Sequence, residues 1–211
     1  MPNDPDRSVP GLLDVAGRYL AESDIADASL DQERDAILRS WPRPRAAATP
    51  PVPQRLPACD YLAAALALAT AGPASHLADA LTPLLAGLRW GYGYPVHPQW
   101  PDLAARVAFA QIIGRRGLMD DDRIHLGLTL MAPRTHYPLH AHPAIELYLV
   151  LAGTAGWRVE GAPFAPQPPG SLILHTSGIG HAMQTDADPL LAFYVWRGDL
   201  ETAPVYIDEA A

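Results

Sequence analysis

The chain has 211 residues, of which 49% are hydrophobic, and a formal net charge of −8 at pH 7. This composition supports one sizeable core, or a small barrel with a helical appendage. The acidic balance disfavours nucleic acid and anionic membranes as partners, and no apolar run approaches the roughly 20 residues of a membrane span. The first residues lack the basic and apolar regions of a signal peptide, and the single Cys59 excludes an internal disulfide, so we expect a cytoplasmic protein.

Helical patterns dominate the first part of the chain. Apolar spacing predicts a helix over 12–20 and a second over 31–41. Six prolines then forbid regular structure, so 42–57 is a predicted loop or extended linker. Further helices are expected over 61–70, 77–88 and 101–113.

Short β patterns follow Arg123. Strands are expected over 124–131, 145–151, 155–160, 171–175 and 190–196, with Gly and Pro between them. On the last strand, alternation places Tyr194 and Trp196 on one face and Phe193 on the other. The predicted organisation is a helical N-terminal region, residues 1–120, packed on a β-barrel, residues 121–211.

Aromatic residues alternate with glycines between these two regions. The segment is Trp90-Gly91-Tyr92-Gly93-Tyr94-Pro95, with His97 and Trp100 close behind. Such a segment is unusual in a mere connector. Either it lays aromatic faces over the mouth of the barrel, or its rings join the helices to the barrel, and the sequence leaves both interpretations open.

Three histidines and a glutamate form the most informative pattern. His140 and His142 make an HxH motif, Glu146 follows four residues later, and His181 is distant. Imidazole and carboxylate groups together are a standard ligand set for one divalent transition metal. Residues two apart on a strand share a face, so the even positions through Tyr148 point together if the turn after His142 keeps register. The odd positions are apolar and would cover the opposite face: Leu139, Ile145, Leu147, Leu149 and Leu151.

The spacing resembles the double motif of the cupin superfamily over residues 124–196. The matching positions are the HxH, Glu146, Gly153, Gly170, Gly178 and His181. Arg134, Thr176 and Thr185 stand where the family usually has Gly, Pro and Asn, and these departures affect turns rather than ligands. The resemblance implies a mainly β fold with α-helices: a C-terminal cupin barrel (a double-stranded β-helix or jelly roll) with an N-terminal α-helical region.

A narrower resemblance is to the cupin-type dimethylsulfoniopropionate (DMSP) lyases of marine bacteria. It is carried by the segments 136–148, 150–157 and 180–183 and by a helical extension of about this length. The resemblance implies a carbon–sulfur lyase that cleaves DMSP to dimethyl sulfide and acrylate. It also implies one divalent metal ion, and the ligand chemistry leaves zinc, iron, manganese, cobalt and nickel open.

Residue roles follow from the resemblance. The implied metal ligands are His142, Glu146 and His181, with His140 as a further ligand or a neighbouring group that contacts substrate. Tyr148 matches the tyrosine placed at the metal, and Tyr137 matches a second active-site tyrosine.

The elimination needs a base and a surface for a sulfonium cation. A tyrosine becomes a usable base only where a nearby cation stabilises its phenolate, which favours Tyr148 over Tyr137. Alternatively, both hydroxyls only satisfy hydrogen bonds in the barrel. Aromatic faces suit a sulfonium by cation–π attraction. The candidates for this role are Trp196, Tyr194, Tyr92 and Tyr94.

Other functions remain compatible with the same ligand set. One is another metal-dependent cupin enzyme, such as a dioxygenase or an isomerase, and another is a small-molecule-binding cupin without catalysis. The expected partner is a small zwitterion or carboxylate, and a homodimer is compatible because cupins often pair. Among the other histidines, His136 could line the pocket rim, whereas His76, His97, His125 and His175 are weaker candidates.

Overall fold

The computed structural model describes residues 5–47 and 49–207. Residues 1–4, from which we predicted that a signal peptide is lacking, lie outside the described residues. So do residues 208–211, at the end of the predicted barrel region. The helices are α1 (Pro5–Glu22), α2 (Ala28–Arg39), η1 (Pro57–Tyr61), α3 (Leu62–Thr70), α4 (Ser75–Leu81), η2 (Thr82–Gly87) and α5 (Leu103–Arg106). None of these helices combines the length and the apolar character that a membrane crossing needs.

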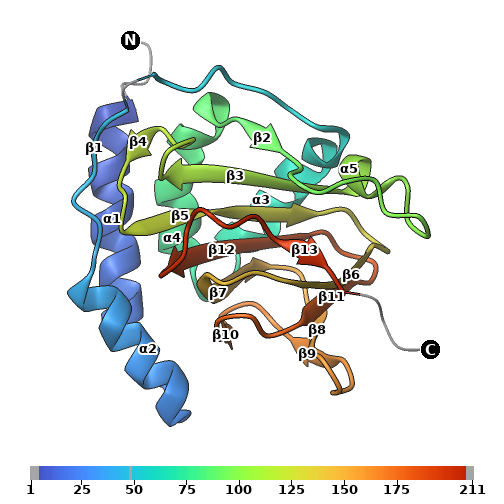
Figure 1. Ribbon diagram of the computed structural model, residues 1–211. Coiled ribbons are helices and arrows are strands. Elements are labelled where there is room, and N and C mark those ends of the chain that lie inside the picture. The colour runs from blue at the N-terminus through green and yellow to red at the C-terminus, as the bar shows by residue number, and fades with distance from the viewer. Residues whose placement is uncertain (1–4, 48, 208–211) are drawn as a thin grey trace.

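The strands lie side by side across the molecule (Figure 1). Up to residue 131 they are β1 (Arg45–Ala46), β2 (Trp90–Gly91), β3 (Val107–Ile113), β4 (Met119–Asp120) and β5 (Ile124–Met131). The remaining strands are β6 (His136–Ala141), β7 (Ile145–Ala152), β8 (Ala155–Val159), β9 (Ala165–Gln167), β10 (Leu172–His175), β11 (His181–Thr185), β12 (Leu190–Arg197) and β13 (Val205–Tyr206).

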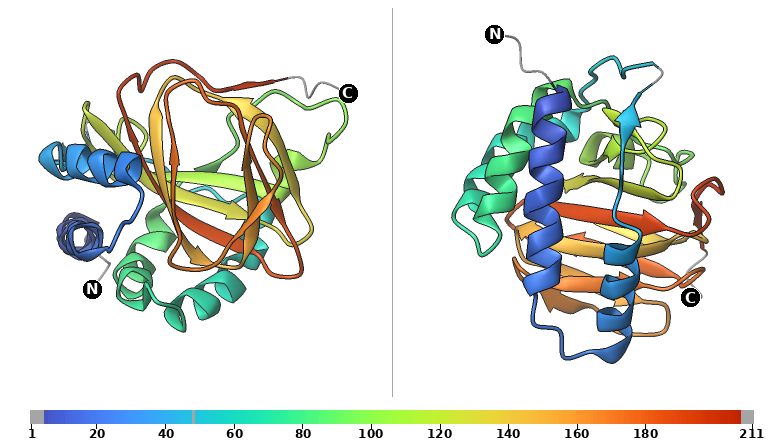
Figure 2. Two further views of the ribbon diagram at one scale, coloured as in Figure 1. Left: turned by 90° about the horizontal axis from the view of Figure 1, so that it is seen from below. Right: turned by 90° about the vertical axis from the view of Figure 1, so that its left-hand side faces the viewer.

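Two mainly antiparallel sheets form the barrel. The eight-stranded sheet has the order β1-β4-β3-β5-β12-β7-β10, with β2 paired to β3, and the five-stranded sheet has the order β13-β6-β11-β8-β9. From β5 to β13 the chain passes repeatedly from one sheet to the other, as a double-stranded β-helix requires. Seen from below, the sheets surround one interior and the helices lie outside it (Figure 2, left). The predicted cupin fold with added helices is confirmed.

The larger sheet has two differently packed faces because side chains alternate along each strand. On β7, Leu147, Leu149 and Leu151 are buried in the same apolar core as α1, α3 and α4. Tyr148 and Val150, from the same strand, belong to a second core inside the barrel. Burying each leucine contributes about 1.5–3 kcal/mol, so the helices stabilise the strands that carry the site. The predicted alternation on β12 is also confirmed, with Phe193 outward and Tyr194 inward.

One predicted helix is wrong. Of the range 101–113, only α5 is α-helical, and β3 pairs antiparallel with β5 from Val107 onward. Gln111 is the one polar residue of β3, so the sequence has no polar stripe to distinguish a strand from a helix. The loop predicted over 42–57 is confirmed apart from the two-residue β1. β2, β3 and β4 lie before residue 121 yet belong to the barrel's larger sheet.

A turn near the HxH motif explains one departure from the cupin pattern. Arg134 has φ = 52°, in the left-handed region where glycine is favoured. Its N–H donates to Asp186 O at 2.7 Å, and Thr185 Oγ1 donates to Ala132 O at 2.7 Å. The arginine therefore adopts the backbone conformation that a glycine would supply, and hydrogen bonds to the neighbouring turn hold it there.

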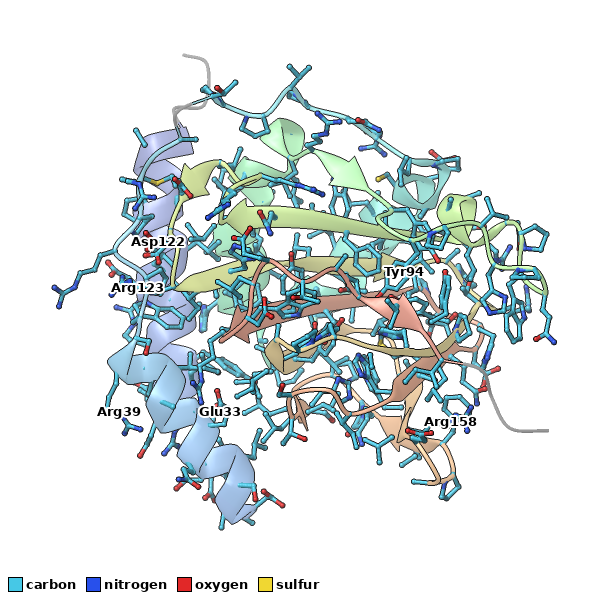
Figure 3. All side chains as sticks on the ribbon, in the orientation of Figure 1. Glu33, Arg39, Tyr94, Asp122, Arg123 and Arg158 are labelled. Carbon is cyan, nitrogen blue, oxygen red and sulfur yellow. The ribbon has the colours of Figure 1, made fainter. Side chains whose placement is uncertain are left out.

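Helix α2 is fastened to the end of strand β12. Glu33 lies on the barrel side of α2 and Arg39 on its outer side (Figure 3). Arg197 pairs with Glu33 through two guanidinium nitrogens, with Nη2 at 2.6 Å from Oε2. A bidentate pair of this kind fixes orientation as well as distance. It anchors β12 one residue beyond Trp196.

Candidate metal centre and substrate cavity

Three of the predicted ligands converge in the barrel interior. His142, Glu146 and His181 each offer one ligand atom, and these atoms lie within 4.8 Å of one another. His142 follows β6, Glu146 lies on β7 and His181 begins β11, so both sheets contribute. All three side chains are buried. His140 is also buried, and its ring centroid is 4.1 Å from that of His181.

Backbone carbonyls set the tautomer of each histidine. Nδ1 of His140, His142 and His181 lies within 3.0 Å of a carbonyl oxygen, which can only accept. The acceptors are Pro138, Ala144 and Ile179. Each Nδ1 therefore carries a proton and donates it, which leaves Nε2 as the ligand atom. Such orientation by a hydrogen bond on the second nitrogen is typical of metal-binding histidines.

The surroundings of His181 Nε2 indicate whether these residues fit a cation. His181 Nε2 is sealed from solvent and has no hydrogen-bond partner among the described residues. A buried polar atom without a partner is rare because it loses its hydration without replacement. Glu146 Oε2 lies 3.5 Å from this nitrogen and 3.0 Å from His142 Nε2. A divalent transition ion would satisfy both nitrogens and the carboxylate, so the residues fit the metal that the cupin pattern implies.

The electrostatics of the cluster favour an ionised glutamate. Burial opposes ionisation, but the surrounding imidazoles of His142, His175 and His181 hold the pKa of Glu146 well below its usual range. Burial alone would lower the pKa of His142, and the Glu146 carboxylate outweighs it and raises that pKa. Burial lowers the pKa of His140 well below its usual value, so this ring is neutral at pH 7.

One row of residues across the larger sheet connects the cluster to its surroundings. The register pairs His125 on β5 with Trp196 on β12, Trp196 with Glu146 on β7, and Glu146 with His175 on β10. Directly paired residues point to the same face of a sheet, so this row faces the barrel interior.

His175 belongs to the cluster although its sequence position made it a weak candidate. Its ring stacks on His181 with centroids 3.8 Å apart, and its Nδ1 lies 3.7 Å from Glu146 Oε2. Burial is the main cause that lowers the pKa of His175 to about 4, so it is neutral at pH 7. The signal that could have revealed it is the antiparallel register of 172–175 against 146–149.

Trp196 contacts two of the predicted ligands. Its Nε1 donates to Glu146 Oε1 at 2.5 Å, and its ring centroid is 4.3 Å from that of His142. The indole therefore orients the carboxylate through one oxygen and leaves Oε2 for the histidine side of the cluster. The sequence predicted Trp196 as a surface for a substrate cation; in the structure it lines the cavity and also contacts Glu146 and His142.

Replacing Trp196 by Phe is expected to weaken metal binding about 10–100-fold, as typically follows loss of a hydrogen bond to a ligand. The ring would still pack on His142, so the missing N–H is the main change. Titration of the metal-free protein with zinc measures the effect. Trp157→Phe is the matched control, because Trp157 Nε1 is buried in the same barrel and has no hydrogen-bond partner within residues 5–47 and 49–207. Equal zinc affinity in both variants would contradict this role.

A cavity of about 780 Å³ leads from the surface to the cluster. This is within the range of small-molecule sites. Its wall includes the cluster residues His140, His142 and Glu146 together with Trp196. Five tyrosines also line it: Tyr92, Tyr94, Tyr137, Tyr148 and Tyr194.

The two tyrosines proposed as bases lie beside the cluster. Tyr148 Oη is 3.3 Å from Thr129 Oγ1, and the ring of Tyr137 stacks on His140 at 4.1 Å. Tyr137 also hydrogen-bonds to Tyr94. Burial raises the pKa of both Tyr137 and Tyr148 well above the usual value, so both are neutral phenols in this environment.

A glycine leaves room for the ring of Tyr194 at the cavity wall. Gly127 on β5 pairs with Tyr194 on β12. A Cβ at this glycine would lie 2.5 Å from Tyr194 Oη and 2.3 Å from Ala110 O, closer than van der Waals contact permits. The Tyr194 ring therefore occupies the space over β5 in which a side chain at position 127 would lie.

The glycine-rich aromatic segment performs both of the roles left open. Trp90 is fully buried in the core shared by the helices and the larger sheet. Tyr92 and Tyr94 line the cavity, with ring centroids 5.5 Å apart. Tyr94 lies beside β13, 4.9 Å from the Tyr206 ring (Figure 3). Tyr92 also hydrogen-bonds to Tyr206, so the segment and the C-terminal strand close one side of the cavity together.

The remaining histidines are distributed around the molecule. His136 and His97 pack against Trp100 outside the cavity wall, and His76 lies exposed on α4. His125, by contrast, lines the cavity.

The fold and the site define a cupin whose interior could hold a metal ion. Residues 31–192 match the family model of the dimethylsulfoniopropionate lyases. The chain therefore belongs to the DMSP lyase family, a family of carbon–sulfur lyases.

Individual relatives agree with this membership. The chain is 35% identical over 156 residues to dimethylsulfoniopropionate lyase DddQ of Ruegeria pomeroyi, a match that covers 74% of this chain and 77% of the relative. It is 38% identical over 151 residues to the putative dimethylsulfoniopropionate lyase DddL of Cereibacter sphaeroides, covering 71% of this chain and 62% of that relative.

Solved structures show the same fold. The crystal structure of DMSP lyase DddQ from Ruegeria pomeroyi superposes with a TM-score of 0.65 at 31% identity, covering 84% of this chain and 94% of the other. A structure reported with the DMSP lyases RdDddP and RnDddQII gives a TM-score of 0.75 at 24% identity, covering 97% and 100%.

Proposed function

We propose that this protein is a metal-dependent lyase that cleaves DMSP to dimethyl sulfide and acrylate by base-initiated β-elimination. The observation that carries the proposal is the convergence of His142, Glu146 and His181 with two tyrosines in one buried cavity, in a member of the DMSP lyase family. His142, Glu146 and His181 would hold one divalent transition ion, with His140 as a further ligand or neighbour. Bound there, the ion would act as a Lewis acid toward the substrate carboxylate and favour a nearby phenolate.

The base removes a proton from the carbon next to the carboxylate. The electron pair of that C–H bond becomes the C=C bond of acrylate, and the C–S pair leaves with neutral dimethyl sulfide. Tyr148 is the proposed base because its strand position, two residues from Glu146, places it on the cluster's face of β7. The Thr129 hydroxyl beside it can donate to the phenolate and thereby stabilise it.

Tyr137 is proposed to orient the substrate carboxylate. Its hydrogen bond to Tyr94 and its stacking on His140 fix both the ring and the hydroxyl. Because this hydroxyl is already ordered, little conformational entropy is lost there when the substrate binds. This favours a positioning role for Tyr137 over a role in proton transfer.

The sulfonium end is proposed to lie against aromatic faces. Tyr92, Tyr94 and Tyr194 line the cavity with Trp196, and a cation over such a ring gains about 0.5–2 kcal/mol. Trp196 presents one face to His142, so only its other face is available to substrate. Tyr194, whose ring lies 5.9 Å from that of Trp196, completes this side of the cavity.

Headspace gas analysis tests the proposal directly. Purified protein given DMSP without oxygen is expected to release dimethyl sulfide, with acrylate appearing in solution in equal amount by proton NMR. Protein treated with a chelator should lose this activity and recover it on addition of one of the five candidate metals. A requirement for oxygen, or absence of both products with every metal, would refute the lyase assignment.

A further inference from the structure

The cavity extends beyond the space around the metal cluster. Its outer wall includes Gln111 and His125 on the larger sheet. In the cross-strand row, His125 lies two strands from Glu146, with Trp196 between them. Strands are spaced roughly 4.8 Å apart, so this part of the wall is about 10 Å from the cluster. A short zwitterion bound at the cluster leaves it unfilled.

A chain of hydrogen bonds fixes the protonation state of His125. The Arg116 backbone N–H donates to Gln111 Oε1 at 2.9 Å, which fixes the orientation of the amide group. Gln111 Nε2 therefore donates to His125 Nδ1, 3.1 Å away. Because Nδ1 accepts, the proton of the neutral ring is on Nε2. Burial lowers the pKa of His125, so the ring is neutral at pH 7.

His125 lines the cavity, and Nε2–H is the one N–H group of its neutral ring. This group has no hydrogen-bond partner among the described residues, yet it does not belong to the atoms sealed from solvent. The turn after β3 packs closely against this ring. Gly114 has φ = +130°, and a Cβ there would lie 2.4 Å from His125 Cδ2 and 2.9 Å from Gln111 Oε1. The backbone of this turn thus packs directly behind the pair.

The cavity lining carries more basic than acidic side chains. Asp120 and Asp121, which also act on His125, are each paired with an arginine, Arg45 and Arg123. Arg89, Arg115 and Arg116 line this cavity, and Glu201 is the single acidic residue apart from the cluster glutamate among the described lining residues. Arg115 pairs with Glu201 at 3.1 Å, which leaves two guanidinium groups in excess. A fixed N–H donor among excess arginines recognises a small anion.

We propose that Gln111 and His125 form an outer subsite that binds a short-chain carboxylate, separate from the metal cluster. The carboxylate accepts the His125 Nε2–H, and Arg89 and Arg116 supply attraction at longer range. The identity of the natural ligand rests on the proposed function: it is either the carboxylate of DMSP during entry or the acrylate product during release. The subsite itself does not depend on lyase activity.

Propionate, which cannot be eliminated, is the probe. Histidine ring nitrogens of the zinc-loaded, ¹⁵N-labelled protein are observed by NMR, and loss of one signal in His125→Phe assigns His125. We expect His125 to show the Nε2–H tautomer, and its Nε2–H signal to shift on addition of propionate. Calorimetry should show propionate affinity reduced roughly tenfold in His125→Phe, as for loss of a hydrogen bond to a charged group. His76→Phe, on the exposed surface of α4, is the matched control.

Kinetics then distinguishes the two sources of the carboxylate. A higher KM for DMSP with unchanged kcat in His125→Phe would identify the entering substrate, and a higher acrylate inhibition constant with unchanged KM would identify the product. Equal propionate affinity in wild type, His125→Phe and His76→Phe, with an unmoved His125 signal, would overturn the subsite. Propionate binding without dimethyl sulfide production would leave the subsite standing and refute only the lyase.

Discussion

Tyr148→Phe is expected to reduce turnover of DMSP by at least the ~10²–10⁴-fold typical of a lost general base. The substitution keeps the ring, which packs between Trp157 and Tyr194 inside the barrel, and removes only the hydroxyl. Folding should be little affected, because the hydroxyl makes one long hydrogen bond, to Thr129, and one to Glu146, which also faces His142 and His175. Metal content should remain close to wild type, since the histidine and glutamate ligands are unchanged. Turnover is measured as dimethyl sulfide released per metal-loaded site.

Tyr137→Phe is the matched control for this prediction. It also removes one hydroxyl from a buried ring beside the cluster, and it should reduce turnover less if Tyr137 only orients the carboxylate. The reverse ranking would transfer the base role to Tyr137, and near-normal turnover in both variants would exclude a tyrosine base. Deuterium at the carbon next to the carboxylate gives a second readout: proton removal that limits the rate predicts slower turnover, with an effect at least as large in Tyr148→Phe.

His181→Ala is expected to lose most of the bound metal, and with it the lyase activity, while the barrel remains folded. Nε2 of His181 is buried and has no hydrogen-bond partner in the described part of the chain. Alanine therefore removes a ligand while Glu146 still faces His142 and His175. Metal analysis after dialysis measures occupancy, and circular dichroism verifies the fold. His142→Ala should behave similarly, and His76→Ala, outside the cavity, should retain full metal. Full occupancy in both cluster variants would refute the ligand assignment.

Metal uptake by the wild-type protein should weaken as the pH falls. Glu146 raises the pKa of His142, so this ring holds a second proton at higher pH than an isolated histidine does. That proton must leave before Nε2 can bind a metal, and competition therefore begins above the usual pKa of histidine, about 6.5. Zinc titrations at several pH values measure the effect, and a pH-independent affinity between about 5 and 8 would contradict it.

Several barrel strands could be predicted because residues that face the helices alternate along them with residues that face the barrel interior. On β7, leucines at odd positions and Glu146 and Tyr148 at even positions specify which face meets the helices and which meets the site. The predicted ranges for β5, β7, β8, β10 and β12 therefore agree closely with the structure. β3 lacks this signal, because Gln111 is its one polar residue and apolar residues occupy both of its faces, and its pairing with β5 decides its conformation.

The parts of the site that could not be predicted depend on neighbours across strands. The spacing of the HxH, Glu146 and His181 is a local property of the cupin motif, so their convergence could be inferred. His175 meets Glu146, and Trp196 donates to it, only because of the registers of β10 and β12. A shift of one residue in either pairing would send those side chains to the opposite face. The Gln111–His125 pair likewise joins two strands and a turn.

The absence of a side chain at Gly127 matters both for the pairing of β5 with its neighbour and for the shape of the cavity. A single added methyl group would collide both with Ala110 O, which belongs to the neighbouring strand, and with the Tyr194 hydroxyl. Any residue other than glycine at this position would therefore have to separate two strands and displace the Tyr194 ring from its place in the cavity wall. Assembly of the sheet and placement of a ring in the cavity wall thus set the same requirement at position 127: the absence of a side chain.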